Sequence, residues 1–307
     1  MNSIYDMIVI GGGPAGYTAA LYAVRSGLST LVIERMGAGG QMTQTLEIDN
    51  YPGFDEGIDG FTLGMKMQSG AEKFGCKTVL AEVRGVKLEG AVKEIETSEG
   101  IYKAKTVVIA TGAKHRHLGI PDEDALIGRG IGYCATCDGM FYRGKTVAVV
   151  GGGNTAAADA LALSRVAKKV YLIHRRDSLR ATKIYHDALS RTENIEFKWN
   201  STVSAFTHDQ QLTGAILTNV SDGSKSELAL DGLFVSIGMD PVTELFKGQL
   251  ELDESGYIVS DESTRTNLPG VYAAGDVRTK KLRQIITAAA DGAVSAHYAE
   301  EYLSELS

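Results

Sequence analysis

Two stretches of this chain repeat one pattern, in which an apolar run, a glycine-rich turn, a helix-like segment and a second apolar run follow one another. The first stretch begins with the run at residues 7–10 (MIVI) and the second with the run at residues 147–150 (VAVV), 140 positions later. The glycines of the two turns are Gly11, Gly13 and Gly16 in the first and Gly151 and Gly153 in the second. A buried strand, a turn with G-x-G-x-x-G spacing and a helix form the βαβ motif that binds dinucleotides. The repeat therefore predicts an α/β chain with two dinucleotide-binding units.

The glycines of such a motif have physical tasks. The first permits a tight turn, the second lets the backbone approach a pyrophosphate, and the third allows the helix to pack closely on the strand. Phosphate then lies at the helix N-terminus, where free N–H groups and the helix dipole favour anions. One glycine turn alone is weak evidence, but here strand, turn, helix, second strand and terminal acid follow in order.

The two motifs differ where the ribose of a nucleotide would lie. Glu34 ends the second apolar run of the first motif and is placed to accept a hydrogen bond from a ribose hydroxyl. The second motif has His174, Arg175 and Arg176 there, with Arg180 beyond them. A carboxylate repels a 2′-phosphate, whereas arginines pair with one. We therefore expect FAD or NAD at the first motif and NADP at the second, unless the arginines simply form a solvated loop.

A Cys-x-x-Cys pair lies between the two motifs. Cys134 and Cys137 are followed at once by Asp138. Such a pair can close a disulfide, whose Cα atoms lie ~4.4–6.8 Å apart, and one of its thiols commonly has a lowered pKa. By itself the pair fits a redox dithiol, half of a metal site or a chance occurrence. Zinc would need two more ligands at a suitable spacing, and only Cys76 and scattered histidines are available, so no metal is expected. Cys76 is expected to be an unpaired structural thiol.

Two further apolar runs end in small residues. Residues 106–109 precede Ala110, Thr111 and Gly112, and residues 271–274 precede Gly275 and Asp276. Open α/β sheets bind ligands at the carboxyl ends of their strands, which makes both places candidate ligand sites. Either run could equally be a buried strand followed by a turn.

Composition excludes several classes of function. The 307 residues carry a formal net charge of −7, so no overall basic field attracts nucleic acid or an anionic membrane. Residues 1–6 lack the cationic segment of a signal peptide, and no stretch reaches the ~18 apolar residues of a membrane span. Three cysteines do not make a disulfide scaffold. We expect a cytoplasmic protein with neither a nucleic-acid nor a membrane partner.

Nearly the whole chain resembles the bacterial-type, low-molecular-weight thioredoxin reductases. The most specific match is residues 134–139 (CATCDG) between the two glycine turns. Further matching segments are residues 39–41 (GGQ), 50–53 (NYPG), 110–112 (ATG), 174–176 (HRR) with Arg180, 275–276 (GD) and 283–284 (RQ). The resemblance implies a homodimer in which a discontinuous FAD domain, residues 1–115 and 241–307, holds an inserted NADPH domain, residues 116–240. Both domains are expected to be doubly wound three-layer (ββα) α/β folds. The second glycine turn inside the chain favours such an insertion independently.

The resemblance also implies which residues contact each cofactor. Those expected at FAD are Gly11, Gly13, Pro14, Ala15, Gly16, Glu34, Arg35, Gly40, Gln41, Asn50, Ala110, Thr111, Gly112, Gly275, Asp276, Arg283, Gln284 and Ile285. Those expected at NADPH are Gly151, Gly153, Asn154, Thr155, Ala156, His174, Arg175, Arg176 and Arg180.

The activity implied is that of an NADPH-dependent thioredoxin-disulfide reductase. Hydride passes from NADPH to FAD, electrons pass to the Cys134–Cys137 disulfide, and the dithiol reduces thioredoxin by exchange. By the resemblance, Cys137 faces the flavin, Cys134 attacks thioredoxin and Asp138 is the general acid. The family rotates its NADPH domain about two short linkers, which would lie near residues 113–119 and 236–241 here.

The chain departs from the family pattern at two places, and three rival functions stay open. Ala158 stands where the family usually has a second acid, and Met239 stands where it commonly has histidine. The donor could be ferredoxin, although relatives that use it typically lack the arginine cluster. The acceptor could be another redoxin or a peroxide-reducing protein. The third rival is a flavin-binding sensor or scaffold in which the cysteines do nothing measurable.

Overall fold

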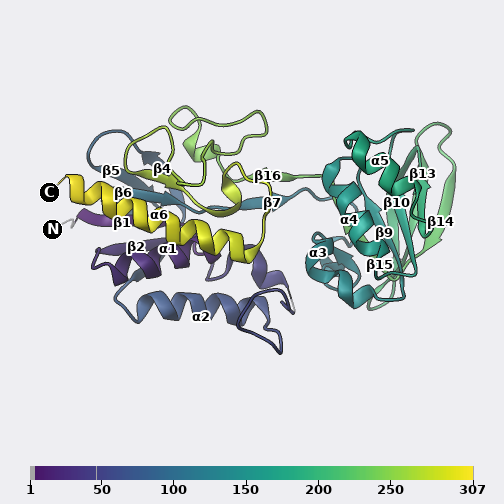
Figure 1. The fold of residues 1–307 in the computed structure, drawn as a ribbon, viewed down its shortest axis with the longest axis horizontal. Coiled ribbons are helices and arrows are strands. Elements are labelled where there is room, and N and C mark those ends of the chain that lie inside the picture. Colours follow the sequence, from purple (N-terminus) through teal and green to yellow (C-terminus); the bar gives the residue numbers. More distant parts are fainter. Residues whose placement is uncertain (1–3, 46, 307) are drawn as a thin grey trace. The chain divides into compact units, whose positions relative to one another are not determined.

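The structure is a computed structural model that describes residues 4–45 and 47–306 (Figure 1). The chain divides into two compact units: residues 1–114 with 240–307, called the terminal unit below, and residues 115–239, called the inserted unit. These boundaries lie one residue from those expected for the FAD and NADPH segments. Residues 1–3, part of the stretch in which no signal peptide was expected, lie outside the described residues.

The terminal unit is built on a largely parallel sheet. Its strand order is β3-β2-β1-β6-β5-β4, and β17 also pairs with β6. The strands are β1 Ile4–Ile10, β2 Thr30–Glu34, β3 Lys77–Leu80, β4 Val83–Lys87, β5 Lys93–Thr97, β6 Gly100–Ile109 and β17 Val271–Ala273. The helices are α1 Pro14–Arg25, α2 Gly60–Glu72 and α6 Ile285–Glu305, with short 3₁₀ segments η1 Gly40–Gln44, η4 Glu244–Phe246 and η5 Gly275–Val277.

The central strands of this sheet are buried on both faces. The side chains of a strand point alternately to its two faces, and β1 shows it: Met7 and Val9 join a core with α1 and α6, while Ile8 and Ile10 join a second core on the other face. A strand buried on both sides needs a continuous apolar sequence, which is why residues 7–10 read as one apolar run.

The inserted unit repeats the doubly wound arrangement on a smaller scale. A parallel sheet has the order β11-β10-β9-β15-β8, and a separate antiparallel sheet has the order β12-β13-β14. The strands are β8 Ile131–Gly132, β9 Thr146–Val150, β10 Lys169–Ile173, β11 Ile195–Lys198, β12 Ser201–His208, β13 Leu212–Asn219, β14 Lys225–Ala229 and β15 Gly232–Val235. The helical segments are η2 Asp124–Leu126, α3 Ala135–Asp138, η3 Gly139–Tyr142, α4 Asn154–Ser164 and α5 Lys183–Ser190.

Two cores hold the inserted unit together. One packs α4 against the parallel sheet, and the other fills the space between the parallel and antiparallel sheets. The chain passes between the units at two short strands, β7 Ala113–His115 and β16 Met239–Pro241, which pair with each other. Two doubly wound α/β units, each with the strand, turn and helix expected from its glycine motif, confirm the predicted fold class.

Candidate functional site

The first glycine turn joins β1 to α1 in the terminal unit. Gly11 has φ +108°, and a Cβ there would meet the backbone oxygen of Ala110 at the end of β6, so only glycine fits. Gly13 differs, because a Cβ there would meet nothing within 4 Å. It caps α1 without a side-chain hydrogen bond, and Pro14 follows at the first helical position. The helix N-terminus therefore presents uncapped N–H groups to open space, as an anion site requires.

Glu34 is held beside this turn by backbone donors. Its Oε2 accepts from the Gly12 N–H at 2.6 Å, and its Oε1 accepts from the N–H groups of Arg35 and Met36 at 2.8 and 3.0 Å. A Cβ on Gly40 would lie 3.5 Å from the Gly13 Cα, so the segment after β2 also borders the turn. The carboxylate lies at the end of β2, where a ribose hydroxyl was expected.

A second group of predicted residues lies near the start of α6. The Asn50 amide donates to Gln284 Oε1 at 3.1 Å, and Gln284 caps α6, whose first residue is Ile285. A Cβ on Gly275 would lie 3.0 Å from the Ala15 Cβ, which puts the η5 turn against the first turn of α1. The structure thus brings segments far apart in sequence to one end of the sheet.

Buried polar atoms at this place lack partners among the described residues. Asp276 Oδ1 and Arg283 Nε are both buried without a hydrogen bond. Burial raises the pKa of Asp276, and the Arg283 guanidinium lies 4.1 Å from the centre of the Tyr257 ring. Unsatisfied buried polar groups are costly, so these atoms fit a polar ligand that satisfies them. FAD, with its pyrophosphate and ribityl hydroxyls, suits this set.

Asp291, which sequence reasoning missed, fixes the η5 turn. Its carboxylate accepts from the Gly275 N–H at 2.9 Å and pairs with Arg278 and Lys280, each at 2.8 Å. Burial by itself raises the pKa of Asp291, but the hydrogen bonds from the two cations outweigh it and lower that pKa. No motif marks this aspartate, because its partners come together only in the fold.

The remaining predicted residues of the terminal unit occupy the same strand ends and turns. Thr111 Oγ1 donates to the Val242 backbone oxygen at 2.7 Å, and Gly112 has φ +70°. Gly16 packs its backbone onto the Gly11 oxygen. Arg35 and Gln41 are exposed.

The second glycine turn joins β9 to α4 in the inserted unit. Gly153 caps α4 without a side-chain hydrogen bond, and a Cβ there would again meet nothing within 4 Å. The Arg180 N–H donates to the Gly152 oxygen at 2.7 Å, and Asn154 Oδ1 accepts from the Thr182 N–H at 2.8 Å. The loop after β10 is therefore folded onto the turn. Thr155 is exposed and Ala156 is buried on α4.

The His174 cluster combines a buried ring with exposed cations. His174 is 5% exposed, and its Nε2 has no partner among the described residues. Burial, with the charges of Arg180, Arg176 and Arg175, lowers the pKa of His174. The three arginines are exposed, and within the described chain none of them forms an ion pair. Uncommitted guanidinium groups at a glycine turn suit a 2′-phosphate.

Cys134 and Cys137 form a disulfide with a Cα–Cα distance of 5.2 Å. Cys134 caps α3, and its Sγ accepts from the Cys137 N–H at 3.2 Å. Asp138 ends the same helix, and burial raises its pKa to about 6. Both sulfurs belong to half-buried residues, so the pair is accessible in part. Next to it, Met140 and Phe141 in η3 are 55% and 42% exposed.

Cys76 is buried and unpaired, as expected, and burial raises its pKa to about 12. His117 lies 3.2 Å from both Asp124 and the Tyr133 hydroxyl. No sequence pattern marks this contact. Asp159, the acid that remains on α4, bonds to Ser236 at 2.5 Å.

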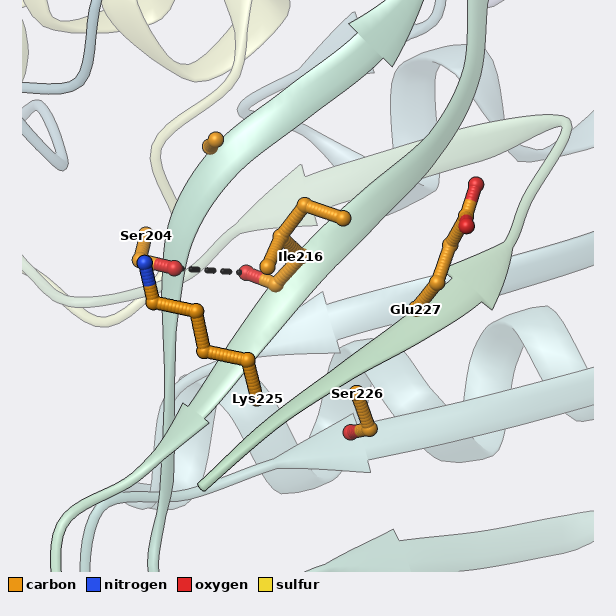
Figure 2. Close-up of a pocket in the computed structure, with 6 residues that line it drawn as sticks. Ser204, Ile216, Lys225, Ser226 and Glu227 are labelled. Atoms are coloured by element: carbon orange, nitrogen blue, oxygen red, sulfur yellow. Dashed lines mark hydrogen bonds between the residues drawn. The ribbon is translucent and has the colours of Figure 1, made fainter. Parts of the chain in front are cut away.

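Figure 2 shows a surface pocket of about 460 Å³ on the antiparallel sheet of the inserted unit. Its lining residues are Ser204, Ala205, Ile216, Lys225, Ser226 and Glu227, and the Ser204 hydroxyl donates to the Ile216 oxygen at 3.2 Å. None of the predicted site residues lines it. Among residues 4–45 and 47–306 no His/Cys/Asp/Glu group is arranged to hold a metal, and no helix is long and apolar enough to cross a membrane.

Comparison with known proteins agrees with this geometry. The family described as pyridine nucleotide-disulphide oxidoreductase matches residues 5–292. The chain belongs to this family. Within these oxidoreductases it is 49% identical to a thioredoxin reductase of Streptomyces clavuligerus, over 100% of this chain and 96% of the relative.

Solved oxidoreductases of the same kind share the fold. The thioredoxin reductase of Streptococcus pyogenes MGAS5005 matches with a TM-score of 0.94 and 44% identity, over 99% of this chain and 100% of that one. A ferredoxin-flavin thioredoxin reductase from Clostridium acetobutylicum matches with a TM-score of 0.53 and 30% identity, over 98% of each chain. The resemblance to thioredoxin reductases is confirmed.

Proposed function

We propose that this oxidoreductase is a thioredoxin-disulfide reductase that uses FAD and NADPH. The observation that carries the proposal is the Cys134–Cys137 disulfide in a chain with two dinucleotide-type glycine turns. Relatives that match over the full length bear the name thioredoxin reductase.

The assignment of the two cofactors follows from the ribose ends of the two motifs. In the terminal unit Glu34, the open space at Gly13 and the unsatisfied Asp276 would hold FAD. In the inserted unit the open space at Gly153 and the exposed arginines would hold NADPH. The flavin, when bound, supplies a two-electron relay between nicotinamide and the disulfide.

The chain's own cysteines carry out the exchange with thioredoxin. In the reduced protein the Cys134 thiolate attacks one sulfur of the thioredoxin disulfide, forming a mixed disulfide and releasing the other sulfur as a thiolate. The Cys137 thiolate then attacks Cys134 Sγ, which restores the internal disulfide and releases the second thioredoxin thiolate. Thioredoxin gains two electrons and the Cys134–Cys137 pair loses two.

Asp138 is suited to proton transfer at this place. A carboxyl with a pKa of about 6 retains a proton in an appreciable fraction of molecules near neutral pH. It follows Cys137 directly, so we assign to it protonation of a departing thiolate. The exposed Met140 and Phe141 beside the pair would contact the apolar surface around the partner's disulfide.

The cysteine pair must exchange electrons with the flavin and also reach an external protein. We propose that the inserted unit rotates about the connections at residues 113–119 and 236–241, with Gly119, Gly238 and Pro241 as hinge residues. Gly119 and Gly238 have φ of +73° and +115°, conformations that glycine adopts freely. A covalent cross-link between the two units is expected to stop multiple turnovers, and unchanged turnover would contradict the hinge.

A homodimer and a cytoplasmic location belong to the same proposal. Phe61 and Met65 lie one turn apart on α2 and are 60% and 42% exposed, which suits a surface covered by a second copy. A dithiol that must stay reducible requires a reducing compartment. Sedimentation of the purified protein tests the dimer, since a monomer at micromolar concentration would contradict it.

An anaerobic absorbance experiment tests the function. NADPH is expected to bleach the yellow protein, and oxidised thioredoxin is expected to restore its colour. Bleaching without recovery would indicate that the electron acceptor is a redoxin other than thioredoxin. No bleaching by NADPH, with bleaching by reduced ferredoxin, would favour the donor named in the Clostridium acetobutylicum relative.

A further inference from the structure

The residue directly before the redox pair is anchored to a buried carboxylate. The Tyr133 hydroxyl donates to Glu123 Oε1 at 2.7 Å. Glu123 is 3% exposed, and its carboxylate also accepts from the N–H groups of Leu118 and Gly119 at 2.9 and 2.8 Å. Three donors on one buried carboxylate fix it firmly, because each lost bond would leave charge unsatisfied.

The ring of Tyr133 is also held along its faces. It stacks on His115 with the centroids 4.9 Å apart and 27° between the planes, and it contacts His117 at 5.3 Å. The His117 Nδ1 lies 3.2 Å from the Tyr133 hydroxyl. These contacts restrain the ring of Tyr133 and, with it, the backbone that leads into Cys134.

Both cysteines are tied to α3, and Cys134 is also joined directly to the anchored Tyr133. Cys137 lies on α3, where its N–H and that of Asp138 bond to the Cys134 oxygen at 3.2 and 3.1 Å. Cys134 is the N-cap of α3 and is tied to the helix by the same two bonds, but its backbone is extended (φ −135°, ψ 97°) and continues directly from Tyr133. The tendency of two thiols to close a disulfide increases with their effective concentration, which falls when one of them gains freedom.

We propose that Tyr133 and Glu123 are positioning residues that set the thiol–disulfide equilibrium of Cys134 and Cys137. The hydrogen bond between them holds Cys134 within reach of Cys137 and so favours the disulfide over the dithiol. The inference rests on the proposed function in that it takes this pair as the redox couple. The overall reaction is unchanged: two thiols lose two protons and two electrons, and thiol–disulfide exchange supplies the oxidant.

The test is an equilibration of the purified full-length protein against dithiothreitol buffers of graded redox ratio. The dithiol fraction is measured by alkylation and mass spectrometry. This measurement needs neither NADPH nor thioredoxin. Tyr133→Phe removes only the hydroxyl and is expected to shift the equilibrium three- to tenfold toward the dithiol, where tenfold corresponds to ~30 mV. The matched control is Tyr171→Phe, since Tyr171 packs against the same apolar core as Tyr133. It is expected to leave the equilibrium unchanged.

A second variant tests whether the effect passes through this hydrogen bond. Glu123→Gln is expected to shift the equilibrium in the same direction as Tyr133→Phe. The double variant is expected to shift it no further than the larger single change, because both remove one interaction. Additive shifts, or equal equilibria in wild type and Tyr133→Phe, would contradict the role of the Tyr133–Glu123 hydrogen bond but not the proposed function. A wild-type protein that forms no Cys134–Cys137 disulfide at any ratio would overturn the anchor and the proposed function together.

Discussion

If the arginine cluster binds a 2′-phosphate, replacing Arg180 with alanine should lower the activity with NADPH much more than the activity with NADH. The Arg180 backbone is held on the second glycine turn by its N–H bond to Gly152 at 2.7 Å, and that bond does not depend on the side chain. The variant should therefore keep its fold and lose one guanidinium at the nucleotide.

The expected magnitude follows from the exposure of the cluster. A hydrogen bond between charged groups is worth ~1.5–3 kcal/mol, and each ~1.4 kcal/mol is a factor of ten in affinity. Because Arg180 is exposed and screened by solvent, the lower end applies. We expect kcat/KM for NADPH to fall about tenfold and that for NADH, which lacks the phosphate, to change less than about twofold.

Stopped-flow measurement of flavin reduction by each nucleotide provides the assay. Arg191→Ala, an exposed arginine after α5, is the matched control and should change neither value. Raising the salt from 0.01 to 1 M shortens the Debye length from ~30 to ~3 Å, so it should reduce the difference between NADPH and NADH in wild type. Equal losses with both nucleotides, or no loss with NADPH, would refute the assignment of the cluster.

Three further results are expected. Because the pKa of Asp138 is about 6, its carboxyl can donate a proton mainly below that pH. The rate of reoxidation by thioredoxin in wild type, divided by the rate in Asp138→Asn, should therefore fall as pH rises through about 6. A ratio that does not change with pH would exclude the general-acid role. Asp291→Ala leaves two cations buried without a counter-charge and should lower the free energy of unfolding by ~3–5 kcal/mol. Since the pKa of Asp291 is lowered in the folded state, its stabilising contribution is present above the pKa of the unfolded state and disappears as pH falls through the pKa of the folded state. Urea titrations of both proteins at several pH values can check this. A side chain at either Gly13 or Gly153 would fill the open space at its helix N-terminus. Gly13→Val should therefore yield protein without flavin colour, whereas Gly153→Val should keep its flavin and lose affinity for NADPH. Loss of flavin in both variants would contradict two separate nucleotide sites.

The sequence predicted the parts of the molecule whose chemistry demands a particular residue at a particular spacing. Gly11 must adopt a positive φ beside the Ala110 oxygen, and Gly13 must leave room at a helix N-terminus, so both can be identified from sequence. Glu34 follows from its place at the end of a strand. These requirements are local, and a short motif contains them.

The parts that sequence did not predict depend on contacts between distant segments. Asp291 is on α6 and neutralises cations from the turn after η5, and nothing within α6 itself indicates this. Glu123 and Tyr133 are ten residues apart without a periodic pattern, and only the fold brings the hydroxyl to the carboxylate. Long-range polar contacts of this kind cannot be inferred from propensity or spacing.

The most direct test of the account compares wild type with the Cys134→Ser/Cys137→Ser double variant in one anaerobic experiment. NADPH is expected to bleach the flavin of both proteins, because the substitutions replace none of the residues assigned to either nucleotide. Oxidised thioredoxin is then expected to restore the colour of wild type and to leave the double variant bleached. Equal recovery in both proteins would show that electrons reach thioredoxin without this disulfide and would contradict the account.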